Sequence, residues 1–201
     1  MYTLDKSHID QMLNAATKLF ASLTAESGTS FAYEPIVLHY KDTLYSRVGL
    51  PPEIFCDNYE REIIFLNTPF KLLWNVEQLK LLSRDMQTRQ IPTNAAFMCV
   101  DESNILRDKL YQNNTDPALI AEIPFVENGF AAVDGNHRIA SAYYQHKPFI
   151  KCKFLPYYVH MNALSPTTQI LFKIMFNIWN YANYCNGNIG EKDLEQLLLD
   201  I

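Results

Sequence analysis

Closely spaced cysteines are missing from this 201-residue sequence. Cys56, Cys99, Cys152 and Cys185 stand far apart, without the short spacing that zinc ribbons and thioredoxin-like redox sites use. We therefore expect reduced, mostly buried thiols, with Cys99 and Cys152 in apolar strands of the core. Counting alone leaves a disulfide between distant cysteines open.

Basic runs and long apolar runs are also missing. The formal net charge of -5 opposes a broad nucleic-acid footprint, because such binding depends on lysines and arginines that displace counterions. The longest uncharged segment, residues 154–172, contains prolines and a histidine, which argues against a membrane-spanning helix. The first residues lack the basic start and apolar stretch of a signal peptide. These absences favour a compact cytoplasmic protein of bacterial type with no membrane partner.

Two familiar kinds of site are absent as motifs. No G-x-x-x-x-G-K-[ST] run occurs, so a nucleotide site here would not be a P-loop. A protein-held metal site is not predicted either, because neither Glu-x-x-His nor paired spacing is found at His8, His39, His146 and His160.

The sequence does contain one concentrated polar turn, Asp134-Gly135-Asn136-His137-Arg138. Before it, residues 125–133 read as two short strands joined at Asn128-Gly129, a pair typical of hairpin turns. After it, residues 139–143 favour a helix that ends near His146-Lys147-Pro148. A strand that passes through a glycine turn into a helix is a setting in which anions bind.

The residue types in this turn suit phosphate. The first amides of a helix lack intrahelical partners and carry partial positive charge. Gly135 lets the backbone approach a ligand, Asn136 is a favourable N-cap, and Arg138 can hold two phosphate oxygens. His137 can donate to an oxyanion or pass a proton. Asp134 would bind a cation, accept a proton or orient its neighbours, and these three roles stay open.

A purely structural interpretation of the same turn is the alternative. Turns rich in Asp, Gly and Asn are common connections between strands and helices. In that interpretation Asp134 and Asn136 cap amides, and Arg138 forms a surface ion pair.

At these residues the sequence resembles the ParB/sulfiredoxin superfamily, in which a strand ends in a D-G-x-H-R, G-C-H-R or G-E-R-R turn beside a nucleotide. The D-G-x-H-R branch, which includes free-serine kinases, is the most similar. The resemblance implies nucleotide phosphate, since partition proteins hydrolyse CTP and sulfiredoxins use ATP. Sulfiredoxin chemistry is disfavoured because Asn136 stands where its cysteine is needed. The pair His137-Arg138, in place of two arginines, favours the kinase-like branch.

The resemblance covers residues 61–156. It implies a first strand at 62–66 and then a loop at 67–71, where Thr68 and Lys71 would meet nucleotide or substrate unless they are only solvated loop residues. It further implies a helix at 76–90 with Arg89 in its last turn, a strand at 95–100, an insertion at 101–118 and a closing strand at 149–154.

The flanks are expected to be largely helical. Apolar residues recur at helical spacing over 9–23 and 171–185, and a short final helix carries Leu194, Leu197 and Leu198. Residues 33–40 are predicted as an added strand, after which Gly49-Leu50-Pro51-Pro52 interrupts regular structure. The expected fold is α+β: a small mixed sheet of ParB/sulfiredoxin type at 61–156, an N-terminal helix and extension at 1–60, and a helical extension packed on the core at 157–201.

The leading functional hypothesis is a phosphotransferase or nucleotide phosphohydrolase that uses ATP, ADP or CTP with Mg²⁺ and an unknown small-molecule or protein acceptor. Asp134, His137 and Arg138 are the candidate catalytic residues, and residues 135–138 hold phosphate. One alternative is a DNA-associated accessory protein of a plasmid, phage or mobile element. Another is a degenerate, non-catalytic domain that binds a partner through its aromatic C-terminal segment. A homodimer stays open.

Overall fold

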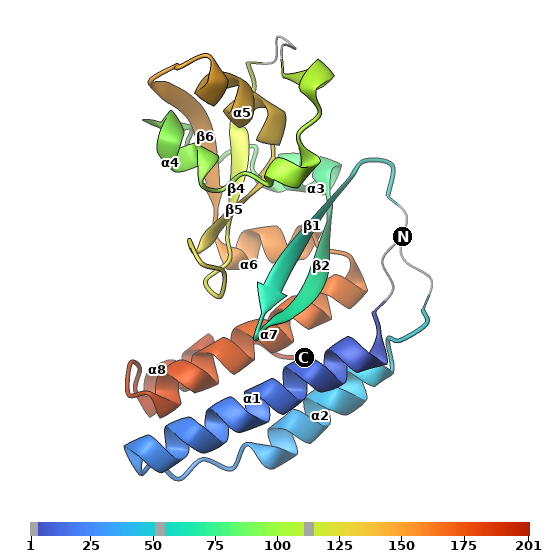
Figure 1. Cartoon of the computed structure of the whole chain (residues 1–201), viewed down its shortest axis with the longest axis vertical. Coiled ribbons are helices and arrows are strands. Elements are labelled where there is room, and N and C mark those ends of the chain that lie inside the picture. Colours follow the sequence, from blue (N-terminus) through green and yellow to red (C-terminus); the bar gives the residue numbers. More distant parts are fainter. Residues whose placement is uncertain (1–3, 51–54, 111–114) are drawn as a thin grey trace. The chain divides into compact units, whose positions relative to one another are not determined.

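The computed structural model describes residues 4–50, 55–110 and 115–201 and shows a mixed α+β protein with small sheets (Figure 1). The chain divides into two compact units. Unit 1 comprises Met1–Ile54, Glu62–Leu72 and Pro166–Ile201, and unit 2 comprises Phe55–Arg61 and Leu73–Ser165. Within the described residues, no helix is both long and apolar enough to cross a membrane.

Unit 1 contains the helices predicted for both flanks. Helix α1 (Lys6–Ser27) begins where the Asp5 carboxylate accepts the Ser7 amide and ends at left-handed Gly28. Helix α7 (Pro166–Cys185) is followed by a turn with left-handed Gly187 and by helix α8 (Glu191–Leu197). These predictions are confirmed. The apolar face of α1 is buried through Ile9, Met12, Leu13, Ala16 and Phe20.

The strand predicted at residues 33–40 is wrong, because this segment opens helix α2 (Glu34–Tyr45). Pro35 stands in the first turn, where its fixed φ suits a helix and no amide is needed. Tyr40 and Leu44, four residues apart, are the buried pair of the helix. Of the predicted interruption at residues 49–52, Gly49 and Leu50 lie in no helix or strand, as expected, and residues 51 and 52 lie outside the described part.

Unit 2 is built on a mixed four-stranded sheet in the order β3-β6-β4-β5. Strands β4 (Ala118–Glu122) and β6 (Phe149–Leu155) are parallel, whereas β3 (Arg89–Pro92) pairs antiparallel with β6 and β5 (Phe130–Asp134) antiparallel with β4. The closing strand predicted at 149–154 is confirmed as β6. The site turn follows β5, an edge strand of this sheet.

Short helices accompany the sheet of unit 2. They are α3 (Val76–Leu82), α4 (Thr93–Phe97), α5 (Asn136–Tyr144) and α6 (Tyr157–His160), with 3-10 turns η1 (Glu102–Asn104), η2 (Arg107–Lys109) and η3 (Met161–Ala163). The core between α4, α5 and the sheet includes Ala96, Ala118, Ile120, Ala132, Ile139 and Cys152. Burial of Ile139 fixes α5 against the strand that delivers the turn.

A two-stranded hairpin, β1 (Asn58–Phe65) and β2 (Thr68–Asn75), replaces part of the expected arrangement. The first strand is confirmed, although it begins earlier. The loop predicted at 67–71 is wrong, because Thr68 already belongs to β2. Leu66 and Asn67 have positive φ values of 48° and 60°, as in a two-residue type I′ turn.

Three further boundaries in unit 2 were predicted wrongly. Helix α3 ends at Leu82 and not at residue 90, because the Lys153 ammonium binds the Ser83 and Arg84 carbonyls at 2.8 and 2.9 Å. Arg89 therefore lies on β3. Residues 95–100, expected as a strand, belong largely to α4 and the turn after it, in keeping with the helix propensity of Ala95 and Ala96.

The strand predicted just before Asn128-Gly129 was also misplaced. The strand that pairs with β5 is β4, and residues 123–129 form the connection between them, ending at left-handed Gly129. The Val126 amide donates to the Ile123 carbonyl at 3.1 Å and the Val126 carbonyl accepts the Gly129 amide at 2.9 Å, so this segment forms turns and not a strand. The predicted insertion at 101–118 contains η1, η2 and the first residue of β4, and residues 111–114 lie outside the described part.

All four cysteines are free thiols. Cys99, Cys152 and Cys185 are buried, as expected, while Cys56 is exposed. Burial raises the pKa of Cys152, which lies on β6, to about 12. Cys99 follows α4 and does not lie in a strand. Burial also raises the pKa of Cys99 and Cys185, so the three buried thiols are inert packing groups at neutral pH.

Candidate phosphate-binding turn

Gly135 makes the turn from β5 into α5. Its φ of 84° and ψ of 20° lie in the left-handed region, and it is the N-cap residue of α5. Asn136 was predicted as the N-cap; that expectation is wrong, because Asn136 is the first helical residue. No side chain caps this nine-residue helix, so its first amides keep their capacity to bind an acceptor.

Asn136 instead joins three segments behind the turn. Its side chain is 5% exposed; Oδ1 accepts the Asp101 amide at 3.1 Å, and Nδ2 donates to the Ala132 carbonyl at 3.3 Å. A buried amide group with both ends satisfied holds its surroundings firmly in place. Asn136 therefore fixes the start of α5 to β5 and to the segment at Asp101.

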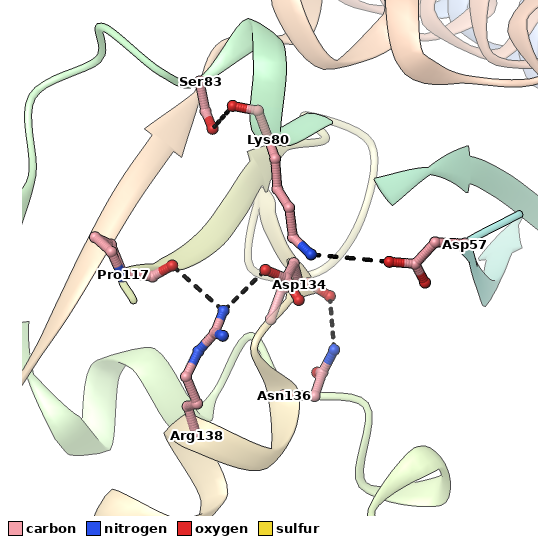
Figure 2. A network of polar contacts seen from close by, with 8 residues as sticks. Asp57, Lys80, Ser83, Pro117, Asp134, Asn136 and Arg138 are labelled. Carbon is pink, nitrogen blue, oxygen red and sulfur yellow. Dashed lines mark hydrogen bonds and ion pairs between the residues drawn. The ribbon is translucent and has the colours of Figure 1, made fainter. Parts of the chain in front are cut away.

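Arg138 folds back over the turn, as Figure 2 shows. Its Nη2 donates to Asp134 Oδ2 at 2.8 Å and to the Pro117 carbonyl at 3.3 Å. The side chains of Arg138 and Asp134 are only 14% and 22% exposed, so the ion pair is partly shielded from water. The Nε of Arg138 is buried and has no hydrogen-bond partner among the described residues. The guanidinium thus has donor capacity left beyond its contacts with the protein.

His137 faces the segment that follows η1. Its Nε2 accepts the Leu106 amide at 3.0 Å, which requires that this nitrogen carry no proton. Burial, and then the nearby Lys109 ammonium, lower the pKa of His137 below its usual value. At neutral pH this imidazole is therefore uncharged, and Nδ1 is the nitrogen that can donate.

The expected insertion is tied to the turn. The Asp101 and Leu106 amides bind Asn136 and His137, and the Asn104 side chain donates to the Glu60 carbonyl at 3.3 Å. These contacts bring the exposed Lys109 close enough to affect His137. Sequence reasoning missed Lys109. The sequence shows that this segment is polar and charged, but it does not show that the segment folds toward α5.

Two residues of β1 were also missed. Arg61 Nη1 donates to the Cys99 carbonyl at 2.6 Å, and Tyr59 lies beside Arg61 and Asn136. Desolvation raises the pKa of Tyr59, so its phenol stays protonated. Arg61 and Cys99 are 38 positions apart in the sequence. No local pattern signals a contact of that kind.

Thr68 and Lys71 are not brought to the turn by any contact within unit 2, because both belong to unit 1. Thr68 is fully buried, and its hydroxyl donates to the Leu66 carbonyl at 3.4 Å, a contact that closes the hairpin turn. Lys71 is half-buried on β2. The structure gives both residues positions in a strand and not in a ligand loop.

The described residues contain no cluster of three or more His, Cys, Asp or Glu side chains that could hold a metal ion. Asp134 is the carboxylate of the turn, and one of its oxygens already binds Arg138. The arrangement can therefore receive an anion at the α5 amides, and Asp134 can orient the guanidinium beside that anion.

Comparison with known proteins adds no relative. No family model matches the chain, no curated protein matches it, and no solved structure matches it.

Proposed function

We propose that this chain is a ParB/sulfiredoxin-type protein that holds nucleotide phosphate at the start of α5 and acts as a phosphotransferase or nucleotide phosphohydrolase. The observation that carries the proposal is the uncapped first turn of α5 behind left-handed Gly135. Such a turn presents several amides to one anion, with the helix dipole behind them.

The charges around this turn support an anionic ligand. The Arg138 guanidinium comes from α5, and the Lys109 ammonium of η2 acts on His137 of the same turn, more strongly than the neighbouring Asp108 carboxylate does in the opposite sense. A phosphate oxygen bound by the amides of residues 136–138 would be in reach of the guanidinium nitrogens that Asp134 leaves unused. Bidentate binding to phosphate is a common use of arginine.

Three side chains would divide the chemistry of transfer. Arg138 and the amides neutralise charge on the transferred group, while the Nδ1 proton of neutral His137 donates to a developing oxyanion. Asp134 orients Arg138 and is the nearby base for an acceptor hydroxyl. If Mg²⁺ bound together with the nucleotide, Asp134 is the residue of the turn that would help to hold it, and the metal would neutralise charge on the phosphate.

The direct test is calorimetric titration of the whole chain with ATP, ADP and CTP in the presence of Mg²⁺. One of these should bind saturably, and Arg138→Ala should weaken binding about 10-fold or more, which corresponds to one lost charge-assisted contact. Arg89→Ala is the matched control, because it removes an exposed arginine of the same unit on β3. Binding that is absent for all three nucleotides, or equal losses in both variants, would refute the proposal.

Turnover is measured separately. Release of inorganic phosphate without an acceptor indicates a phosphohydrolase, whereas phosphate transfer to free serine, the acceptor suggested by the D-G-x-H-R resemblance, indicates a kinase. Asp134→Asn should lower turnover while nucleotide affinity is kept or improved, because it removes a base and a negative charge near the phosphate. A parallel loss of affinity and turnover would assign Asp134 to structure alone.

A further inference from the structure

The other end of α5 meets α4 and the start of β6 (Figure 1). A hollow of about 590 Å³ opens there, which is within the size range of small-molecule pockets. Six of the residues that line it carry aromatic or polar side chains: Thr93, Asn94, Tyr143, Tyr144, His146 and Lys147. All belong to unit 2.

One wall of the hollow is aromatic and held in a fixed orientation. The Tyr143 ring stacks on Phe97 with ring centroids 3.9 Å apart and an angle of 8° between the planes. Tyr144 meets both rings edge-on, at 5.6 Å from Tyr143 and 5.9 Å from Phe97. Tyr144 is nevertheless 52% exposed. Rings that are packed on one side and open on the other provide a stacking surface for a planar guest.

The polar residues of the hollow set the charge of that guest. Lys147 supplies an ammonium group to the lining, and none of the lining residues is a carboxylate. His146 and Asn94 add donors. Sugar sites commonly need acceptors for several hydroxyls, and this lining provides few, so an anion fits better than a neutral sugar.

Two further features indicate that these side chains are kept for a guest. Thr93 is 2% exposed, and its hydroxyl has no hydrogen-bond partner among the described residues. A buried hydroxyl without a partner is costly and is relieved when a ligand supplies one. His146 has a φ of 53°, a left-handed position where glycine would be less strained, yet an imidazole is placed there.

We propose that this hollow binds a small planar aromatic anion, with its ring against Tyr143 and Tyr144 and its acid group at Lys147 and His146. The hollow differs in residues and position from the turn at Gly135, so neither site depends on the other.

The test uses 2-naphthoate as probe and 2-naphthamide as its uncharged counterpart, titrated into the ¹⁵N-labelled whole chain and followed by amide chemical shifts. Naphthoate should shift the amides of residues 93, 94 and 143–147 saturably and bind about 10-fold more tightly than the amide, as expected for one charge-assisted contact. Lys147→Met should remove this preference, and Tyr144→Ala should weaken both probes. Both side chains are exposed, so neither change should unfold the protein.

Lys151→Met is the matched control, because Lys151 is an exposed lysine of β6 that does not line the hollow. Arg138→Ala should also leave naphthoate binding unchanged, which separates this site from the phosphate turn. The proposal would be overturned by equal affinity for both probes or by chemical shift changes confined to residues 134–138. Equal effects of the two lysine variants, or saturable binding of glucose in place of naphthoate, would also overturn it.

Discussion

The guanidinium of Arg138 lies directly over Gly135. A Cβ added at position 135 would come within 2.6 Å of Arg138 Nη2 and within 2.8 Å of the Ala118 Cβ. The glycine is therefore required twice, once for its left-handed φ of 84° and once for the space that its missing side chain leaves. This relationship ties the conformation of the turn to the position of its main cation.

Gly135→Ala should destabilise the protein strongly. The left-handed backbone costs about 1–2 kcal/mol for a non-glycine residue, and overpacking against Ala118 adds about 1–3 kcal/mol. Gly129→Ala is the control, because its φ is 68° but no atom lies within 4 Å of an added Cβ. Urea unfolding should therefore show a clearly smaller loss for Gly129→Ala; equal losses would mean that Arg138 and Ala118 yield without cost.

Asn136→Ala should also lower the free energy of unfolding, although the side chain is polar. It leaves the Ala132 carbonyl and the Asp101 amide without their partner in a buried place, at a cost of about 1–3 kcal/mol. Asn128→Ala removes a comparable bond, from Nδ2 to the Met98 carbonyl, at an exposed position. That control should change stability by less than about 0.5 kcal/mol. Thermal unfolding of both variants measures the two losses of stability. A larger loss of stability in Asn128→Ala than in Asn136→Ala would contradict the role given to Asn136.

The sequence was sufficient for features that depend on neighbours in the chain. The helical spacing of Ile9, Met12 and Leu13 and the glycine at 28 predicted α1 correctly, and the apolar face of α7 was equally readable. The helix after Arg138 was also predicted correctly. Its cap was not, because a left-handed glycine and a favourable asparagine compete for adjacent positions.

Short segments and distant contacts could not be read in this way. Residues 95–100 are too few to show a period, so an apolar strand and a single helical turn look alike. Two hydrogen bonds join segments that are distant in the sequence and meet only after folding. One runs from the Leu106 amide to His137, and the other from Arg61 to the Cys99 carbonyl. The candidate residues of the turn were visible in the sequence, but their mutual bonds were not.

Acid should destabilise the protein through His160. This histidine is fully buried; Trp74 Nε1 donates to its Nδ1 at 3.4 Å, and its Nε2 lies 2.7 Å from the Glu122 carbonyl, to which it donates when neutral. Burial lowers the pKa of His160 to about 4, against an ordinary value of 6.5. The unfolded chain therefore binds more protons between these two values, and stability falls as the pH drops from 6.5 toward 4.

The expected loss from this histidine is about 3 kcal/mol, converted from the difference between the two pKa values. It is measured as the difference between the pH profiles of unfolding of the natural chain and His160→Gln, which keeps a donor and an acceptor but does not titrate. A titration of the His160 ring by NMR gives the pKa directly. Profiles that run parallel between pH 7 and pH 4 would show that His160 takes up its proton at the same pH in the folded and the unfolded chain, so that burial does not lower its pKa.

His146→Gly should stabilise the protein and at the same time weaken the proposed aromatic site. Helix α5 ends with the Lys147 amide bonded to the Ala142 carbonyl at 2.9 Å and the His146 amide to the Tyr143 carbonyl at 3.0 Å, while His146 has a φ of 53°. Glycine is the preferred residue in such a helix end, so relief of strain should gain about 0.5–1 kcal/mol after the added flexibility of the unfolded chain is subtracted. Gln145→Gly, at a φ of -86°, is the control and should destabilise instead. Urea unfolding of both variants measures the change in stability, and titration with 2-naphthoate measures the change in binding. A stabilised protein that binds naphthoate as before would show that the strained histidine does not serve the hollow.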